Sequence, residues 1–325
     1  MITTSLCKLL GIQHPILNAS MSDTATGQLA AAVSEEGGFG MIGGTNAVGP
    51  SWLREQIAIA RSRTDRPFGV GFISCFPDID ELVEVAIDER VSAINHSFAD
   101  PAPFVEPAHR AGIKVFAMVQ TVELAKNAAA CGVDVIIAQG GEAGGHGGNL
   151  GTFALLPAVV DAVGNIPVIA AGGIGDGRGV AAALMLGAQG VWLGTRFVAS
   201  EEWGGGSYKQ EAVLDATTDD TVTTSIYDSI WGEYFPDYIS HRVLHNAYVD
   251  QWQGHDAEIE ARREAFQEDL RAADRREDRA VAGVSAGLAA GLVKSKLPAG
   301  EIVQQLMQEA ERVLRERTTA VLVNA

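Results

Sequence analysis

The chain has 325 residues, of which 47% are hydrophobic, with 37 glycines and only 11 prolines. This composition is typical of a folded protein with one large domain and excludes a disordered chain. The formal net charge of −17 excludes a broad basic surface for nucleic acid or anionic membranes, but it leaves room for a local phosphate pocket.

Three cysteines, Cys7, Cys75 and Cys131, lie far apart and form neither a C-x-x-C pair nor a zinc-ligand spacing. They predict no disulfide framework and no structural metal, which favours a reducing cytoplasm. The first residues lack the basic and apolar regions of a signal peptide, and no apolar stretch reaches the ~18 residues of a membrane span. We therefore expect a cytoplasmic protein that binds no nucleic acid or membrane, and a homo-oligomer is compatible with the sequence.

Eight short apolar runs alternate with amphipathic stretches from His14 onward, which is typical of repeated strand–helix units and a parallel sheet. Their spacing of roughly 20 to 30 residues fits one strand, one helix and two short loops. We predict strands at 15–18, 39–43, 68–73, 92–96, 114–119, 133–139, 167–171 and 191–194. Eight evenly spaced units favour an α/β fold of the closed (β/α)8 TIM barrel type over a doubly wound open sheet.

Three segments between these runs carry the start and stop signals of helices. Residues 24–35 follow a capping residue, Asp23 or Thr24, and stop at the glycine pair 37–38. Residues 121–131 end at Gly132, and residues 176–186 end at Gly187.

The regular alternation ends after Thr195. We therefore predict a barrel domain at residues 1–200 and an aromatic-rich, mainly helical extension at 201–325 that packs on it. Residues 255–279 and 301–317 are highly charged and predict solvated helices. Residues 281–293 (VAGVSAGLAAGLV) are small enough to permit close helix packing or a tight approach to a ligand. Bulky aromatic residues in the extension either pack it onto the barrel, which we favour for most of them, or cover a pocket: Tyr227, Trp231, Tyr234, Phe235, Tyr238, Tyr248 and Trp252.

The loop after the sixth strand, Gln139–Gly148, reads QGGEAGGHGG. Glycine lacks a Cβ and permits positive φ, so this loop can bring backbone N–H groups and the His146 side chain close to a ligand. On its own, the pattern fits a turn with a solvated histidine equally well. We expect Glu142 to anchor the turn to backbone N–H groups.

In a barrel, the loops after the seventh and eighth strands commonly bind a phosphate. The seventh strand is followed by AGGIGDG (171–177), where backbone N–H groups and a helix N-terminus can face an anion. The eighth is followed by Gly194, Thr195 and Arg196, which offer a hydroxyl and a charge unless Arg196 pairs with Glu201 or Glu202. These loops predict a mononucleotide-like phosphate with the cofactor ring across the barrel mouth, where the Gln139 amide can reach a polar ring edge. The GxGxxG-like pattern comes too late in the chain for a dinucleotide fold.

The other histidines give weaker signals. His96 ends the fourth strand and either shapes the substrate pocket or is a buried core histidine. His241 and His245 are four residues apart, but no carboxylate motif accompanies them and no H-E-x-x-H pattern occurs, so we predict no metal site.

With these motifs the chain resembles the FMN-dependent nitronate monooxygenases, formerly called 2-nitropropane dioxygenases. The similar segments are PILNASM, LAAAVSEEGGFGMIGG, AQGGEAGGHGG, IPVIAAGGIGDGRG, VWLGTRF and, beyond the barrel, HRVLHN. The resemblance implies that His146 is the catalytic base. It also implies FMN contacts from Met21, Gln139, Gly144, Gly145, Gly172, Gly173, Trp192, Leu193, Gly194 and Thr195. The chain departs from the family pattern at Gly71, where many members have an asparagine, and in NASM, where many read APM.

The resemblance implies oxidation of a nitronate or nitroalkane by dioxygen to a carbonyl compound and nitrite. A neutral imidazole is suited to accept the proton next to a nitro group. The FMN-dependent enoyl-acyl-carrier-protein reductases, which use a nicotinamide, are also similar in the GGH loop, but the acidic chain disfavours docking of an acidic carrier protein. A flavin-binding protein without catalysis is the alternative from a different functional class.

Overall fold

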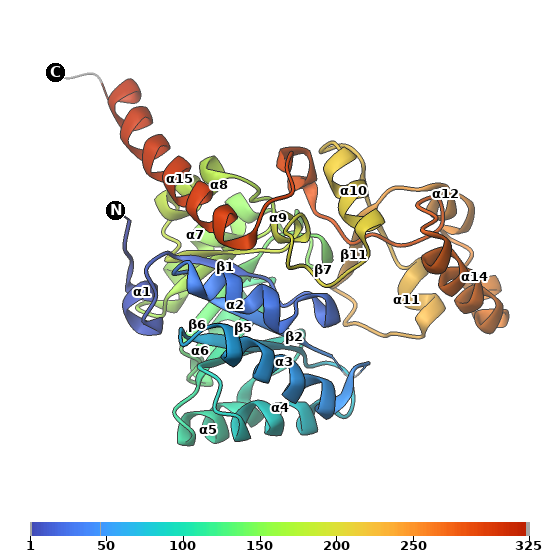
Figure 1. Cartoon of the computed structure of the whole chain (residues 1–325), viewed down its shortest axis with the longest axis horizontal. Helices are drawn as coiled ribbons and strands as arrows, with labels where there is room; N and C mark the ends of the chain where they lie inside the picture. The colour runs from blue at the N-terminus through green and yellow to red at the C-terminus, as the bar shows by residue number, and fades with distance from the viewer. Residues whose placement is uncertain (1, 46, 323–325) are drawn as a thin grey trace.

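The structure is a computed structural model and describes residues 2–45 and 47–322. Its eight-stranded parallel sheet has the order β1-β9-β8-β6-β5-β4-β3-β2, and a parallel bridge from Leu17 to Phe39 joins β1 to β2 and closes the barrel (Figure 1). The strands are β1 (Ile16–Asn18), β2 (Gly40–Gly44), β3 (Phe68–Ile73), β4 (Ala93–Ser97), β5 (Lys114–Val119), β6 (Val135–Gln139), β8 (Val168–Ala171) and β9 (Gly190–Leu193). The predicted (β/α)8 barrel is confirmed, and each predicted strand lies within two residues of an observed one.

Helices follow the strands and cover the outside of the barrel (Figure 1). They are α2 (Gly27–Glu35), α3 (Gly49–Arg63), α4 (Ile79–Asp88), α5 (Ala102–Arg110), α6 (Val122–Ala130), α7 (Thr152–Val163) and α8 (Gly177–Met185). The helices predicted at 121–131 and 176–186 are present, and Thr121 and Asp176 cap α6 and α8 by accepting backbone N–H groups of the first turn. The start predicted for α2 was wrong, because residues 22–24 form a separate 3-10 turn, η1 (Ser22–Thr24), and Thr26 is the cap. No helix among the described residues is long and apolar enough to cross a bilayer.

The inside of the barrel is filled by side chains. Alternate residues of each strand point inward, so Met41, Phe116, Ile137 and Trp192 pack together there. Helix α1 (Ser5–Leu10) adds Leu6 and other apolar residues to this inner cluster and closes the amino-terminal end. Because the centre is packed, a ligand cannot enter the barrel interior, and the carboxyl-terminal rim is where active sites of such barrels usually form.

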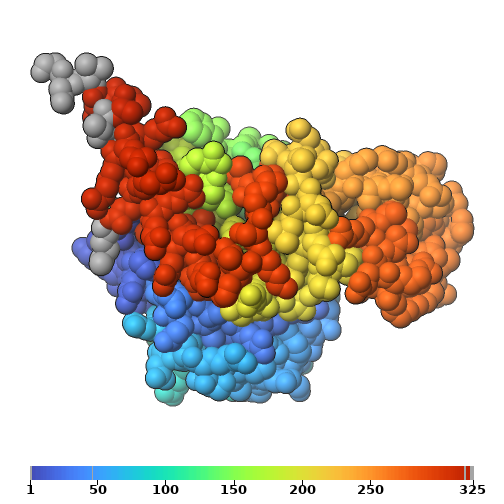
Figure 2. Space-filling view, turned by 45° about the horizontal axis from the view of Figure 1, so that its top comes forward, coloured from blue at the N-terminus to red at the C-terminus, as the bar shows by residue number. Residues whose placement is uncertain are grey.

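A long segment between β9 and the last helix departs from the barrel pattern. It contains α9 (Thr195–Val198), α10 (Ser207–Asp215), β10 (Thr221–Thr224), α11 (Ile226–Trp231), β11 (Ser240–Leu244), α12 (Ala247–Trp252), α13 (Asp256–Ala261), α14 (Arg263–Arg276) and the 3-10 helix η2 (Leu288–Leu292). Helices α11 to α14 form a lobe beside the barrel, seen at the right of Figures 1 and 2. The lobe has its own apolar core of buried residues, including Ile226, Tyr227, Tyr248 and Phe266.

The last helix, α15 (Ala299–Val321), returns to the barrel and packs against α8 and α2. Figure 2 shows it in red, lying across the barrel surface. Its residues Ile302, Val303 and Ala310 are fully buried, so the prediction of a solvated helix here was wrong for this face. The charged segment 255–279 likewise forms two helices, α13 and α14, that bury Phe266 and Leu270. The domain boundary at residue 200 stays a prediction, and we propose that α15 be counted with the barrel because it takes the place of the helix after the eighth strand.

Candidate active site

A cavity of about 400 Å³ opens at the carboxyl-terminal rim of the barrel, a volume in the usual range for small-molecule sites. The structure brings all the sequence-predicted site residues together around it: Met21, Gln139, Gly144, Gly145, His146, Gly172, Gly173, Trp192, Leu193, Gly194 and Thr195. They come from four separate loops or strand ends, because the carboxyl ends of parallel strands meet at one rim. Their individual contacts to a cofactor stay predictions.

Glycines make one wall of the cavity open to a ligand. Gly172 and Gly173 have φ of +99° and +74°, conformations that disfavour other residues. A Cβ on Gly194 would meet nothing closer than Ala19 at 3.6 Å, and one on Gly145 would meet nothing within 4 Å. The backbone N–H groups of Gly173, Gly194 and Thr195 donate to no protein acceptor in the described chain. This bare backbone fits a phosphorylated cofactor such as a flavin mononucleotide.

The helix N-terminus predicted to face the phosphate is already occupied. Asp176 accepts the N–H groups of residues 178 and 179, and Glu309 of α15 accepts the N–H of Gly177 at 2.9 Å. Arg196 is also not available to an anion, because its side chain is buried and donates to the carbonyl of Ser295. It does not pair with Glu201 or Glu202 either. Of the three phosphate donors predicted from the sequence, the loop backbone is therefore available in this cavity, and the helix start and Arg196 are not.

His146 is held by a short antiparallel sheet. Strand β7 (Gly145–Gly147) pairs with β11, and His146 lies opposite His241 in this pairing. The Gln139 amide donates to the His146 carbonyl at 2.9 Å and accepts from Gln120. Gln139 thus holds the histidine loop, with one N–H left for the polar ring edge that the sequence assigned to it.

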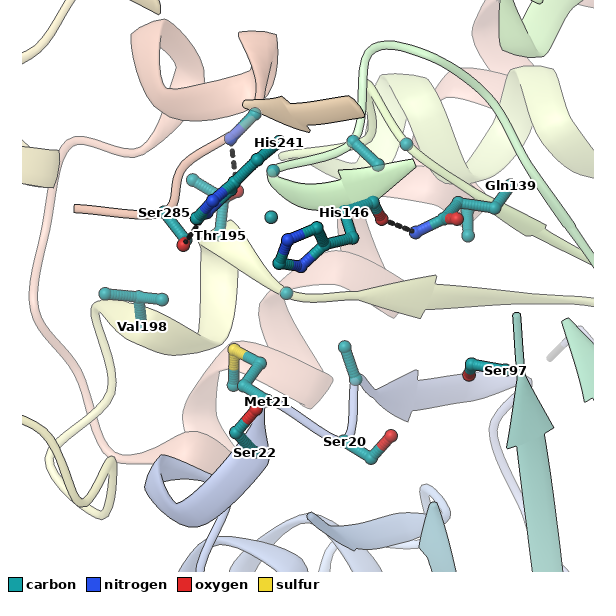
Figure 3. Close-up of a pocket in the computed structure, with 18 of the residues that line it drawn as sticks. Ser20, Met21, Ser22, Ser97, Gln139, His146, Thr195, Val198, His241 and Ser285 are labelled. Carbon is teal, nitrogen blue, oxygen red and sulfur yellow. Dashed lines mark hydrogen bonds between the residues drawn. The ribbon is translucent and has the colours of Figure 1, made fainter. Parts of the chain in front are cut away.

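An acidic residue from the lobe links the two histidines. Asp228 Oδ1 lies 3.0 Å from His146 Nε2 and 3.1 Å from His241 Nδ1. His241 Nε2 lies 2.9 Å from Ser285 Oγ. The imidazole of His146 lies between His241 and Met21 in Figure 3, and the two imidazole rings are stacked at 4.3 Å. The grouping of His146, Asp228 and His241 was not predicted from the sequence.

Burial and hydrogen bonding determine the protonation of this group. Burial lowers the pKa of His146, and the Asp228 hydrogen bond only partly offsets this, so its imidazole is neutral near pH 7. Burial alone would raise the pKa of Asp228, but the hydrogen bonds from both histidines prevail and lower it to about 2. Glu233 also lines the cavity, and burial together with the Asp228 charge raises its pKa. The site therefore combines a neutral histidine with a fixed negative charge behind it.

Phenylalanines form an apolar wall beside His146. Phe235 stacks on the His146 ring at 3.6 Å and meets Phe76 and Phe98 edge-on at 5.1 and 5.6 Å. Of the aromatic residues predicted either to pack or to cover a pocket, Phe235 covers the pocket, whereas Tyr227 and Tyr248 pack the lobe core. The wall excludes water from one side of the imidazole and favours an apolar substrate group there.

Two other sequence expectations have clear outcomes. Glu142 accepts the backbone N–H and the hydroxyl of Thr152 at the start of α7, which confirms its anchoring role. His96 points away from the cavity and is buried, with its ring stacked on Phe104 at 4.4 Å and Nδ1 bonded to Ser74. The pocket role considered for His96 was wrong, and burial lowers its pKa to about 3.

The two departures from the family pattern lie side by side. A Cβ on Gly71 would come within 2.2 Å of Ser20 Oγ, so Ser20 of the NASM segment fills the space beside Gly71. Asn95 of the next strand lies 3.5 Å from the same point. Ser20 lines the cavity, so a polar group remains at this edge although the third strand carries no asparagine.

The segment 281–293 does make a close approach, as its small residues allowed. Gly287 donates to Thr195 Oγ1 at 3.0 Å, and a Cβ on Gly144 would lie 2.4 Å from Gly287 N. Leu288 donates to the Glu142 carbonyl. Residues 281–293, the return segment from the lobe to the barrel, thus hold the histidine loop and the loop after β9 together.

Comparison with known proteins agrees with this geometry. A family model described as nitronate monooxygenase matches residues 3–83 and 78–309. A relative from Rhodococcus jostii, named a 5-hydroxy-7a-methyl-1-oxo-octahydro-1H-indene-4-carboxyl-CoA dehydrogenase, is 38% identical over 201 residues, which are 62% of this chain and 56% of the relative. The match thus spans little more than half of that relative's length.

Two solved structures share the fold over nearly the whole chain. FabK from Thermotoga maritima has a TM-score of 0.89 and 36% identity, covering 99% of this chain and 100% of its own. A nitroalkane oxidase from Streptomyces ansochromogenes has a TM-score of 0.83 and 28% identity, covering 98% and 99%. Because the family model matches most of the chain, the chain belongs to the nitronate monooxygenase family, a family of flavin-dependent oxidoreductase enzymes.

Proposed function

We propose that the protein binds FMN and oxidises alkyl nitronates and nitroalkanes with dioxygen to a carbonyl compound and nitrite. The observation that carries the proposal is the neutral His146 beside a glycine-lined cavity with free backbone donors. The family membership and the similarity to a nitroalkane oxidase support it. FMN, when bound, supplies the electron exchange between the substrate and dioxygen.

The protein's own residues bind, orient and deprotonate the substrate. Gly173, Gly194 and Thr195 would hold the phosphate by backbone N–H groups, and Met21 would lie near the flavin ring. His146 takes the proton from the carbon that bears the nitro group. Phe235 shields the imidazole from water, which keeps it neutral and ready to accept this proton.

The first test is purification followed by a visible spectrum and oxygen-consumption assays with a panel of nitronates and neutral nitroalkanes. We expect bound flavin, identified as FMN after release, and nitrite formed with oxygen uptake. A protein that binds no flavin, or that binds flavin and oxidises no member of the panel, would contradict the proposal.

The second test replaces the base. We expect His146→Ala to lower kcat/KM for neutral nitroalkanes by about 10²- to 10⁴-fold, the usual contribution of general base catalysis. Preformed nitronates should be affected much less, because their proton is already lost. Equal losses for both substrates would show that His146 does not act as the base.

A second candidate is an oxidoreductase that uses a nicotinamide and acts on an acyl thioester. The 38% identity to a relative named as a carboxyl-CoA dehydrogenase favours it. Anaerobic reduction of the bound flavin by NADH or NADPH at a rate that supports turnover would establish this candidate over the nitronate monooxygenase.

A further inference from the structure

The inserted lobe contributes charged and imidazole groups directly to the proposed base. Asp228 and His241 lie 82 and 95 residues after His146 in the chain. Both histidine side chains nevertheless lie within hydrogen-bond distance of the same oxygen, Asp228 Oδ1. Each side chain is at least 80% shielded from solvent. A buried carboxylate destabilises the folded protein unless it is fully paired, so the presence of Asp228 between two histidines requires an explanation.

The hydrogen-bond partners determine which ring nitrogen carries a proton. An ionised carboxylate accepts only, so His146 Nε2 and His241 Nδ1 must both donate to Asp228. His241 Nε2 is then left as an acceptor and receives the Ser285 hydroxyl at 2.9 Å. On His146 the remaining nitrogen, Nδ1, has no proton and no protein partner among the described residues.

We propose that Asp228 and His241 are positioning residues that fix His146 in the Nε2–H form and direct Nδ1 as the proton acceptor. In the step itself the substrate C–H bond breaks, its electron pair stays on carbon as the nitronate anion, and the proton forms a bond to His146 Nδ1. Asp228 holds the resulting imidazolium through the Nε2–H bond. This inference rests on the proposed function for its chemistry, but not for the proton positions.

His241 has a separate part in this arrangement. It donates a second hydrogen bond to Asp228 and, through Ser285, is itself fixed to the return segment. Its ring lies 4.3 Å from that of His146, so a positive charge on both rings would be unfavourable. The contacts of His241 to Asp228 and to Ser285 therefore fix the orientation of the carboxylate beside His146. Glu233, on the loop after α11, is the other acidic group beside this cluster.

Ring stacking distinguishes this arrangement from a metal site. The three ligand atoms lie within 4.8 Å of one another, close enough for a shared ion. The two imidazole planes are inclined by only 30° with ring centroids 4.3 Å apart, so the rings are stacked on each other, and one nitrogen of each ring contacts the same Asp228 oxygen. Tetrahedral zinc needs its ligands to converge from different directions. Two N–H donors on one carboxylate oxygen fit these rings better.

The chain offers a matched control at the other end of the barrel. Asp134 also accepts a histidine N–H, from His109 Nε2 at 2.8 Å, and its side chain has a similar exposure, 14% against 16% for Asp228. It lies just before β6, at the amino-terminal face and away from the cavity. Asp134→Asn therefore makes the same chemical change in an aspartate–histidine pair that has no part in the proposed site.

The first experiment is nitrogen-15 NMR of the holoenzyme with labelled histidine rings, assigned by His146→Ala and His241→Ala. We expect a protonated Nε2 and an unprotonated Nδ1 for His146, and the opposite form for His241. A proton on His146 Nδ1 would overturn the proposal. Addition of Zn²⁺ to the holoenzyme should leave these signals in place, and stoichiometric zinc binding with loss of both N–H signals would also overturn it.

The second experiment compares Asp228→Asn with Asp134→Asn on neutral and ionised substrates. We expect Asp228→Asn to lower kcat/KM for a neutral nitroalkane about 10- to 100-fold and to shift the acidic limb of its pH profile to lower pH. We expect a change of less than about threefold for the preformed nitronate, and no change for Asp134→Asn on either substrate. Equal losses on both substrates would overturn the positioning role.

Asp228→Glu is the rescue variant, since it keeps the charge, and should recover part of the lost rate. If Asp228→Asn loses its flavin or does not fold, the ring protonation of the wild-type holoenzyme decides the proposal alone. If no nitroalkane is oxidised at all, the proposed function fails, while the NMR result still supports or overturns the proton positions. The two failures are therefore distinguishable.

Discussion

The two ends of the barrel use the same kinds of residue for different purposes. At the amino-terminal face, Asp134 accepts from His109, from Lys114 and from a backbone N–H, and none of these residues lines the cavity at the rim. At the carboxyl-terminal rim, Asp228 accepts from two histidines that line an open cavity. The first pair joins neighbouring elements of the barrel. The second leaves one imidazole nitrogen of His146 without a partner among the described residues, as the proposed base requires.

The same contrast holds for glycines with positive φ. Gly173 at the rim has φ of +74° and Gly112 at the amino-terminal side has φ of +78°, so alanine is strained at both positions by about 1 to 2 kcal/mol. A Cβ at residue 112 meets nothing within 4 Å, whereas one at residue 173 meets the Glu142 side chain at 3.2 Å beside the cavity. The strain is shared, but of these two glycines only Gly173 lines the cavity proposed to bind the cofactor.

This comparison of two glycines therefore predicts a difference in flavin binding. Gly173→Ala should weaken FMN binding by at least about tenfold, which corresponds to about 1.4 kcal/mol, and Gly112→Ala should leave it unchanged. Fluorescence titration of the flavin-free proteins measures both, and thermal unfolding should show similar destabilisation of the two variants. If both variants bind FMN as the wild type does, the glycine loop after β8 does not form the cofactor site.

Much of this rim was predictable from sequence because it depends on local patterns. Apolar runs with regular spacing gave the eight strands, and barrel topology then placed the loops after the sixth, seventh and eighth strands beside each other. Glycine content indicated which loops approach a ligand. These inferences need only the order of elements along the chain, so they brought His146, Gly173 and Thr195 to one cavity.

The remainder depended on long-range packing that leaves no local signal. Asp228 lies in a short helix of the lobe, and its sequence neighbours do not indicate that it meets His146. His241 is part of the HRVLHN segment, but its spacing to His245 does not indicate its partners, because His241 lies in β11 and contacts Asp228, whereas His245 follows the strand and contacts Asp250. In α15 the sequence does carry a signal, because Ile302, Leu306 and Ala310 are spaced four residues apart on one helix face, and the high charge of the segment concealed it.

The next test concerns His96, which is buried without a carboxylate partner. By contrast, His109 at the amino-terminal face and His146 and His241 at the rim each contact an aspartate. Its pKa is about 3 in the folded protein and about 6.5 when unfolded, so only the unfolded chain takes up the proton between these values. The free energy of unfolding should then fall as pH falls from about 6.5 toward 3, by up to ~1.4 kcal/mol per pH unit. Denaturant unfolding of wild type and His96→Gln over this range measures the difference. A wild-type slope that His96→Gln leaves unaltered, or that His109→Gln removes equally, would rule out His96 as its source.

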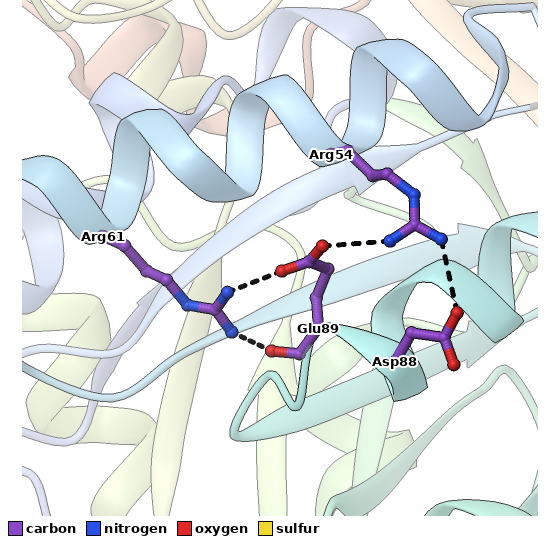
Figure 4. Close-up of polar contacts among 4 residues, drawn as sticks. All are labelled: Arg54, Arg61, Asp88 and Glu89. Carbon is purple, nitrogen blue, oxygen red and sulfur yellow. Dashed lines mark hydrogen bonds and ion pairs between the residues drawn. The ribbon is translucent and has the colours of Figure 1, made fainter.

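The smallest effect is expected at the outer surface, where ion pairs are exposed to solvent and lie away from the active-site cavity. Arg54 of α3 binds Asp88 and Glu89 at the end of α4, and Arg61 binds Glu89 as well (Figure 4). Water and salt screen such exposed pairs, so Arg54→Ala should shift the unfolding midpoint less than any variant above and leave flavin binding and turnover unchanged. The shift should disappear in ~1 M salt, where the screening length is only ~3 Å. A shift that persists in salt would mean that Arg54 acts through packing of its aliphatic stem between α3 and α4 and not through its charge.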